Sequence, residues 1–252
     1  MAGHSKWANI RHRKERQDSK RSKIWSKCSK ALMAAARAGG PDPDTNLTLR
    51  YAIDEAKYAN MPKDTIKRAI DKGAGSGQGD SYESITYEGY GPGGTAIIID
   101  TLTDNKNRTV TEIRTLFKKG GGSLGNAGTV AYMFQTKGQI LVDAAKVSEE
   151  QIMDLAIEAG AEDVQAPEAD DDDAGFWTII TEATGFQQVK VAIEEAGIEI
   201  TEAQIAKIPD DTVAVAGEDA KKVVNLIEGI EDNDDVQSVY TNADIDAASL
   251  AD

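Results

Sequence analysis

The chain has 252 residues, of which 40% are hydrophobic and 28% are charged, so it is long enough for two or three packed cores. The single cysteine, Cys28, excludes an intramolecular disulfide and a cysteine-based zinc cluster, and it indicates a reducing compartment. The net charge of -15 combines two opposite parts: residues 1–72 carry 17 Lys+Arg against 8 Asp+Glu, and residues 73–252 carry 11 against 35. We therefore expect contacts with polyanions to be confined to the N-terminal part.

The first 72 residues predict a basic arm followed by three helices. Apolar residues recur at spacings of three and four over 19–38 and again over 46–59. A third helix is expected to begin at Pro62 and to stop at Gly73. Glycine at alternate positions over 73–80 then predicts a flexible linker.

The acidic part alternates short β-rich runs with helical patterns. We expect a hairpin of strands 82–88 and 95–102, a helix over 108–119 and a strand over 129–134. The strands and helices expected next have the order βαββαβ, typical of ferredoxin-like domains: strand 139–142, helix 149–158, strands 162–166 and 176–181, helix 186–195 and strand 198–206. A strand over 213–216, a helix over 220–230 and a strand over 236–240 complete the chain.

These elements predict an α+β multidomain protein. Its expected parts are an arm and three-helix domain (1–72), a linker (73–80), a discontinuous α+β domain (81–136 and 208–242) and an inserted βαββαβ domain (137–207). Both α+β domains are expected to be ferredoxin-like, one placed inside the other.

Basic residues are concentrated at the N-terminus, where residues 1–40 hold 11 Lys+Arg and two acids. Aromatic rings interleaved with such cations can stack on unpaired bases, and the cations can contact phosphates. A solvated surface helix is the plain alternative. The candidate nucleic-acid-binding residues are Lys6, Trp7, Arg11, His12, Arg13, Lys14, Arg16, Lys20, Lys23, Lys27, Lys30, Lys63, Lys67 and Arg68.

A glycine-rich loop follows the helix expected over 108–119. Its candidate phosphate-binding residues are Lys118, Lys119, Gly121, Gly122, Ser123 and Gly125. The loop lacks the context of a Walker or dinucleotide-binding motif, so nucleotide hydrolysis is not expected. A helix cap followed by a loop that positions a strand explains the same glycines equally well.

No arrangement of serine, cysteine and histidine fits nucleophilic catalysis, because Cys28 lies in a helical apolar stripe and the only histidines, His4 and His12, belong to the basic arm. We expect neither an enzyme nor a metal or cofactor site. No apolar run is long enough for a signal peptide or a membrane span, which favours a cytoplasmic protein without membrane contact. An organellar transit peptide is the alternative interpretation of the basic start.

Several long stretches resemble the YebC/PmpR family, which includes the mitochondrial translational activator of cytochrome oxidase. They are AGHSKWANIRHRK (2–14), MPKDTIKRAI (61–70), YEGYGPGG (87–94), TDNKNRT (103–109) and GGSLGNAGTVAYMF (121–134). The resemblance implies one helical and two α/β domains, no catalytic activity and, in bacteria, a cytoplasmic location.

The resemblance implies regulation of gene expression and leaves two descriptions open. One is a DNA-binding transcriptional regulator, and the other is a ribosome- or rRNA-associated translation factor. An adaptable basic arm with an aromatic residue suits irregular RNA, whereas reading duplex DNA asks for a clearer recognition helix. An adaptor that binds a small effector or a protein partner is a third hypothesis, and the sequence does not indicate the oligomeric state.

Overall fold

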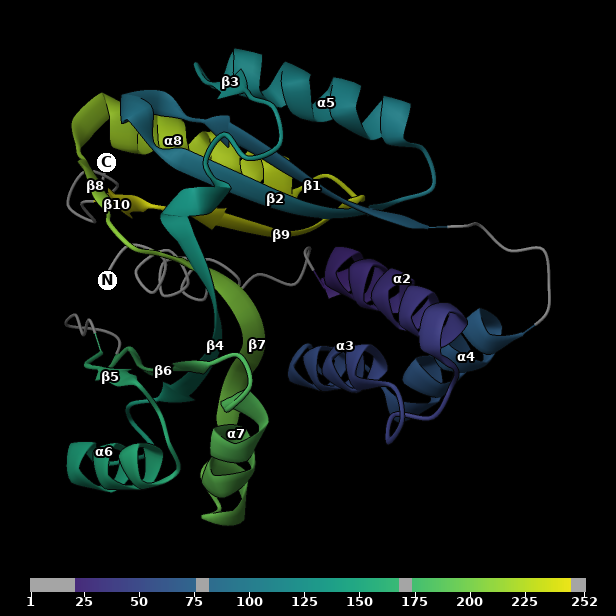
Figure 1. Cartoon of the computed structure of the whole chain (residues 1–252), viewed down its shortest axis with the longest axis vertical. Coiled ribbons are helices and arrows are strands. Elements are labelled where there is room, and N and C mark those ends of the chain that lie inside the picture. The colour runs from purple at the N-terminus through teal and green to yellow at the C-terminus, as the bar shows by residue number, and fades with distance from the viewer. Residues whose placement is uncertain (1–20, 76–81, 168–173, 246–252) are drawn as a thin grey trace. The chain divides into compact units, whose positions relative to one another are not determined.

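The computed structural model describes residues 21–75, 82–167 and 174–245 (Figure 1). The contacts among these residues divide the chain into two compact units. The first unit contains residues 21–75, 82–134 and 209–245, and the second contains residues 135–167 and 174–208.

Three helices begin the first unit: α2 (Arg21–Gly39), α3 (Leu47–Tyr58) and α4 (Lys63–Ala74). The predicted apolar stripe forms their core, in which Cys28, Leu32 and Leu49 are at most 3% exposed. The buried Asn46 caps α3 by accepting the backbone N–H of Leu49, and its side-chain amide donates to the carbonyls of Ala35 and Gly40 near the end of α2. One residue therefore fixes the corner between two helices.

The third helix does not stop at Gly73 as predicted but continues to Ala74. A Cβ atom at position 73 would lie 2.4 Å from the carbonyl oxygen of Met33, so only glycine lets α4 approach the backbone of α2 this closely. The glycine serves helix packing instead of ending the helix.

An antiparallel four-stranded sheet follows in the order β3-β1-β2-β9. Its strands are β1 (Glu83–Tyr90), β2 (Ala96–Thr103), β3 (Ser123–Leu124) and β9 (Val236–Thr241). The helices α5 (Lys106–Lys119) and α8 (Gly217–Glu231) pack against each other and against this sheet (Figure 1). A 3-10 turn, η2 (Pro92–Gly94), closes the hairpin of β1 and β2, and a parallel pair, β8 (Val213–Val215) and β10 (Ala243–Ile245), completes the unit.

The strand predicted over 129–134 is wrong. The segment forms a 3-10 turn, η3 (Ala131–Met133), before β4 begins at Phe134. The buried carboxylate of Glu88 accepts the backbone N–H groups of Gly128, Val130 and Ala131 at 2.7–2.8 Å. Amides held by this carboxylate are not available to a strand ladder.

The second unit follows the predicted order βαββαβ: β4 (Phe134–Asp143), α6 (Glu149–Glu158), β5 (Asp163–Gln165), β6 (Phe176–Glu182), α7 (Phe186–Glu195) and β7 (Ile200–Pro209). Its antiparallel sheet has the order β5-β6-β4-β7. The first unit differs, because two strands rather than one precede α5. The protein is thus an α+β protein with a three-helix module and two four-stranded sheets.

Candidate nucleic-acid interface

The candidate residues of the basic arm lie outside the described residues. They are Lys6, Trp7, Arg11, His12, Arg13, Lys14, Arg16 and Lys20. The remaining candidates belong to α2, α4 and the glycine-rich loop, all in the first unit.

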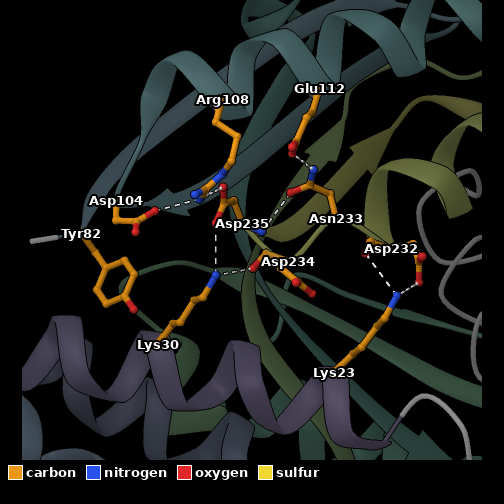
Figure 2. A pocket seen from close by; sticks show the side chains of 10 residues that line it. All are labelled: Lys23, Lys30, Tyr82, Asp104, Arg108, Glu112, Asp232, Asn233, Asp234 and Asp235. Carbon is orange, nitrogen blue, oxygen red and sulfur yellow. Dashed lines mark hydrogen bonds and ion pairs between the residues drawn. The ribbon is translucent and has the colours of Figure 1, made fainter. Parts of the chain in front are cut away.

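The three predicted lysines of α2 all reach one acidic segment. We use this name for residues 231–235, which read Glu-Asp-Asn-Asp-Asp, begin at the last residue of α8 and lead to β9. The Nζ atom of Lys23 lies 2.5 Å from Oδ1 of Asp232. The Nζ atom of Lys30 donates to the carbonyl of Asp234 at 2.8 Å and to Oδ1 of Asp235 at 3.1 Å (Figure 2). Carboxylates of the same chain therefore lie where phosphates were expected.

Lysine side chains of α2 also contact carbonyl groups at the C-terminal end of α8. Lys27 donates to the carbonyl of Glu231 at 2.6 Å, and Lys23 approaches the carbonyl of Asp232 at 3.5 Å. The end of a helix leaves carbonyls without an intrahelical partner and carries a partial negative charge, so cations are favoured there. Burial lowers the pKa of Lys27, and the surrounding carboxylates oppose that change.

Asp235 is the most enclosed acid of the segment, with a side chain 3% exposed. Its Oδ2 atom accepts Arg108 at 2.7 Å, the hydroxyl of Thr109 at 2.8 Å and the hydroxyl of Thr103 at 3.1 Å. Burial by itself would raise the pKa of Asp235, but the hydrogen bonds from Arg108, Thr109 and Lys30 outweigh it and lower the pKa to about 2. This carboxylate joins α2, α5 and β2 at one point.

A polar pocket opens beside these contacts (Figure 2). Glu112 accepts the side-chain amide of Asn233, and Nζ of Lys30 lies 6.0 Å from the ring centre of Tyr82. The cations of the pocket are already paired with acids, so it offers no ready site for a small anion. It is lined by Lys23, Lys30, Tyr82, Asp104, Arg108, Glu112, Asp232, Asn233, Asp234 and Asp235.

The candidate residues of α4 are placed differently. The side chains of Lys63 and Lys67 are exposed and make no hydrogen bond or ion pair with another described residue. Arg68 is also exposed and bonds only within its own helix, to the carbonyl of Asp64 and the hydroxyl of Thr65. These three cations can reach a phosphate backbone without breaking a contact to another element.

The glycine-rich loop ends α5 and positions β3, as in the alternative interpretation of its glycines. The amides of Gly122 and Gly125 donate to the carbonyls of Phe117 and Glu88, which leaves neither amide for a phosphate. A Cβ atom at Gly122 would lie 2.4 Å from the carbonyl oxygen of Tyr90, so this glycine serves the close passage of β3 along β1. Exposed Lys118 and Lys119 end α5, while Gly121 and Ser123 continue the loop.

The sequence did not indicate the acidic segment as part of this interface. Asp235 and Arg108 lie far from α2 along the chain, and no local spacing connects them to Lys30. The four acids within five residues were the only available signal. Among residues 21–75, 82–167 and 174–245, no group of three His, Cys, Asp or Glu side chains could hold a metal ion, and no helix could cross a membrane.

These features define a multidomain α+β protein whose helical module presents cations. The chain matches the "TACO1/YebC protein N-terminal domain" over residues 5–76 and the "TACO1/YebC second and third domain" over residues 82–243. It therefore belongs to the TACO1/YebC family, as the sequence motifs predicted.

Similar proteins agree with this assignment over nearly the full length. A "Probable transcriptional regulatory protein" of Natranaerobius thermophilus is 51% identical over 98% of this chain and 97% of its own, and one of Rubrobacter xylanophilus is 47% identical over 100% and 98%. The crystal structure of the conserved hypothetical protein Aq1575 from Aquifex aeolicus shares 45% identity with a TM-score of 0.82, over 91% of this chain and 92% of that one. The expectation of a YebC-like regulator of gene expression rather than an enzyme is confirmed.

Proposed function

We propose that this protein regulates transcription by binding DNA through its helical module. The names of its relatives support regulation of transcription. The observation that carries the binding surface is the group of exposed α4 cations, Lys63, Lys67 and Arg68, which contact no other element within the described residues. Phosphate contacts of this kind supply affinity and register, and they do not by themselves select a base sequence.

The arm residues 6–20 belong to the same proposal, as do Lys118 and Lys119 at the end of α5. We retain three domains, with the boundaries predicted above, and a ferredoxin-like fold for the inserted domain as part of it. The location is proposed to be the cytoplasm, where a DNA-binding regulator meets its target.

Binding to ribosomal RNA is the second candidate function. It is supported by the cations and Trp7 of the N-terminal arm, which suit stacking on unpaired bases and contact with an irregular phosphate surface. On α4, neither Lys63 nor Lys67 is held by another residue in a fixed orientation, which also suits backbone contact better than base reading.

The test is a competition among promoter-length DNA, ribosomes and unrelated RNA at one salt concentration. The variant Lys63→Gln/Lys67→Gln should lower the affinity for every polyanion. It should also flatten the slope of log K against log salt by roughly 0.7 to 0.9 for each lost phosphate contact. The matched control is Lys146→Gln/Lys222→Gln, which removes the same charge from two lysines that are each 52% exposed.

Discrimination of one duplex sequence by about a thousandfold or more, with ribosomes ignored, would support the transcriptional function. Preference for ribosomes would favour the second candidate. If neither DNA nor RNA binds measurably at low salt, the proposed function is refuted.

A further inference from the structure

The acidic segment 231–235 occupies the face of α2 on which the sequence predicted phosphate contacts. Lys23, Lys27 and Lys30 lie about one helical turn apart, and each donates to an oxygen of this segment at 2.5–2.8 Å. The acceptors include both carboxylates and main-chain carbonyls, so a row of partly or fully negative oxygens follows the row of ammonium groups. A nucleic-acid backbone presents the same kind of surface to lysine.

The contact between α2 and the acidic segment is enclosed at Lys30 and exposed to solvent at Lys23. At Lys30 both partners are enclosed, since the side chains of Lys30 and Asp235 are 17% and 3% exposed. At Lys23 the contact is open to solvent, with the side chain 45% exposed and that of Asp232 66% exposed. An exposed ion pair contributes little free energy and is screened by salt, so the Lys23 end can release first.

We propose that the acidic segment is an intramolecular competitor for the nucleic-acid-binding face of α2, and that a bound phosphate backbone displaces it from Lys23 and Lys27. This inference rests on the proposed function and adds a regulated second surface to the exposed cations of α4. In the closed state the acidic segment is bound to the lysines of α2, and in the open state it is released from them. The affinity measured for nucleic acid is the intrinsic affinity of the open state multiplied by the fraction of molecules in that state.

The acidic segment would also make the basic face of α2 selective among polyanions. A helix with lysines on one face would attract any polyanion, but here a weak binder must first displace carboxylates that are present at high effective concentration. Extended partners that also engage the cations of α4 can do so, whereas small anions cannot. The acidic segment thereby favours long nucleic acids over free nucleotides and phosphate.

The experiment uses the full chain and measures affinity for one duplex DNA and one structured RNA. The variant Asp232→Asn/Asp234→Asn removes two acids of the segment and leaves the buried Asp235 in place. We expect it to bind whichever nucleic acid the wild type binds about threefold to tenfold more tightly, because the closed state loses the ion pair of Asp232 with Lys23 and the attraction of the Asp234 carboxylate for Lys27. The control Glu158→Gln/Glu195→Gln makes the same change of net charge at two exposed residues of α6 and α7.

A second measurement follows the segment itself by hydrogen exchange. Addition of saturating nucleic acid should speed exchange of the amides of residues 232–236, although binding normally slows exchange. Suppose that the wild type binds nucleic acid, that the Asp232→Asn/Asp234→Asn variant gains no more affinity than the control, and that exchange at 232–236 is unchanged. This inference is then refuted, while the proposed function stands. If no protein, wild type or variant, binds any nucleic acid, both are refuted.

Discussion

Neutralising Asp235 should destabilise the first unit, and the loss should depend on pH. The change Asp235→Asn keeps the volume of the side chain but removes the charge that Arg108 and Lys30 stabilise. The folded state lowers the pKa of Asp235 from 3.8 to about 2. A shift of this size corresponds to about 2.4 kcal/mol of stability at neutral pH, and partial exposure of Arg108 makes about 2 kcal/mol the expected measured loss.

The sign follows from the lowered pKa. A carboxyl group that is more acidic in the folded state stabilises the fold fully above its unfolded pKa of about 4, and this contribution is lost as the pH falls through about 2. The difference between wild type and Asp235→Asn should therefore be constant from pH 7 to pH 5. It should shrink below pH 4.

The assay is urea denaturation followed by circular dichroism from pH 7 to pH 3. Hydrogen exchange of peptides from β9 and α5 at pH 7 assigns the loss to the first unit, since the units need not unfold together. The control is Asp104→Asn, because Asp104 also binds Arg108 at 2.7 Å but its side chain is 40% exposed. We expect this control to lose at most about 0.5 kcal/mol. Equal losses for the two variants, or a loss at Asp235 that does not change with pH, would refute the reasoning.

Two further predictions test single contacts that shape the first unit. The change Glu88→Gln replaces one acceptor oxygen by a donor, so it should lower the free energy of unfolding by about 1–3 kcal/mol. Hydrogen exchange at residues 128–131 should accelerate before exchange in the neighbouring strands does, and unchanged exchange there would contradict the role given to this carboxylate. The change Gly73→Ala would ordinarily stabilise a helix by about 1 kcal/mol, but contact with the carbonyl of Met33 should reverse the sign. A lower Tm, measured by tryptophan fluorescence to which the partly buried Trp25 contributes, would show this, and a higher Tm would disprove it.

Elements with local signals could be predicted from the sequence almost to the residue. The helices α6 and α7 have the predicted bounds, 149–158 and 186–195, because apolar periodicity acts within a few residues, as does the capping Ser148 of α6. Elements that depend on contacts between residues far apart in the chain could not be predicted in this way. The turn at 131–133 depends on Glu88, about 40 residues earlier, and the short β10 pairs with β8, about 30 residues earlier.

The same distinction between local and distant contacts applies to the candidate interface. Spacings of three and four residues place Lys23, Lys27 and Lys30 on one face of α2 and its buried core residues on another, because the period of a helix is a local property. What that face touches is not local, since the acidic segment lies 204–209 residues away along the chain. The total charges of the two parts of the sequence predicted that polyanions contact only the basic part, because the acidic part repels them. In the folded chain a piece of that acidic part is bound to the basic face, so the same lysines that indicate nucleic-acid binding also determine what a nucleic acid must displace.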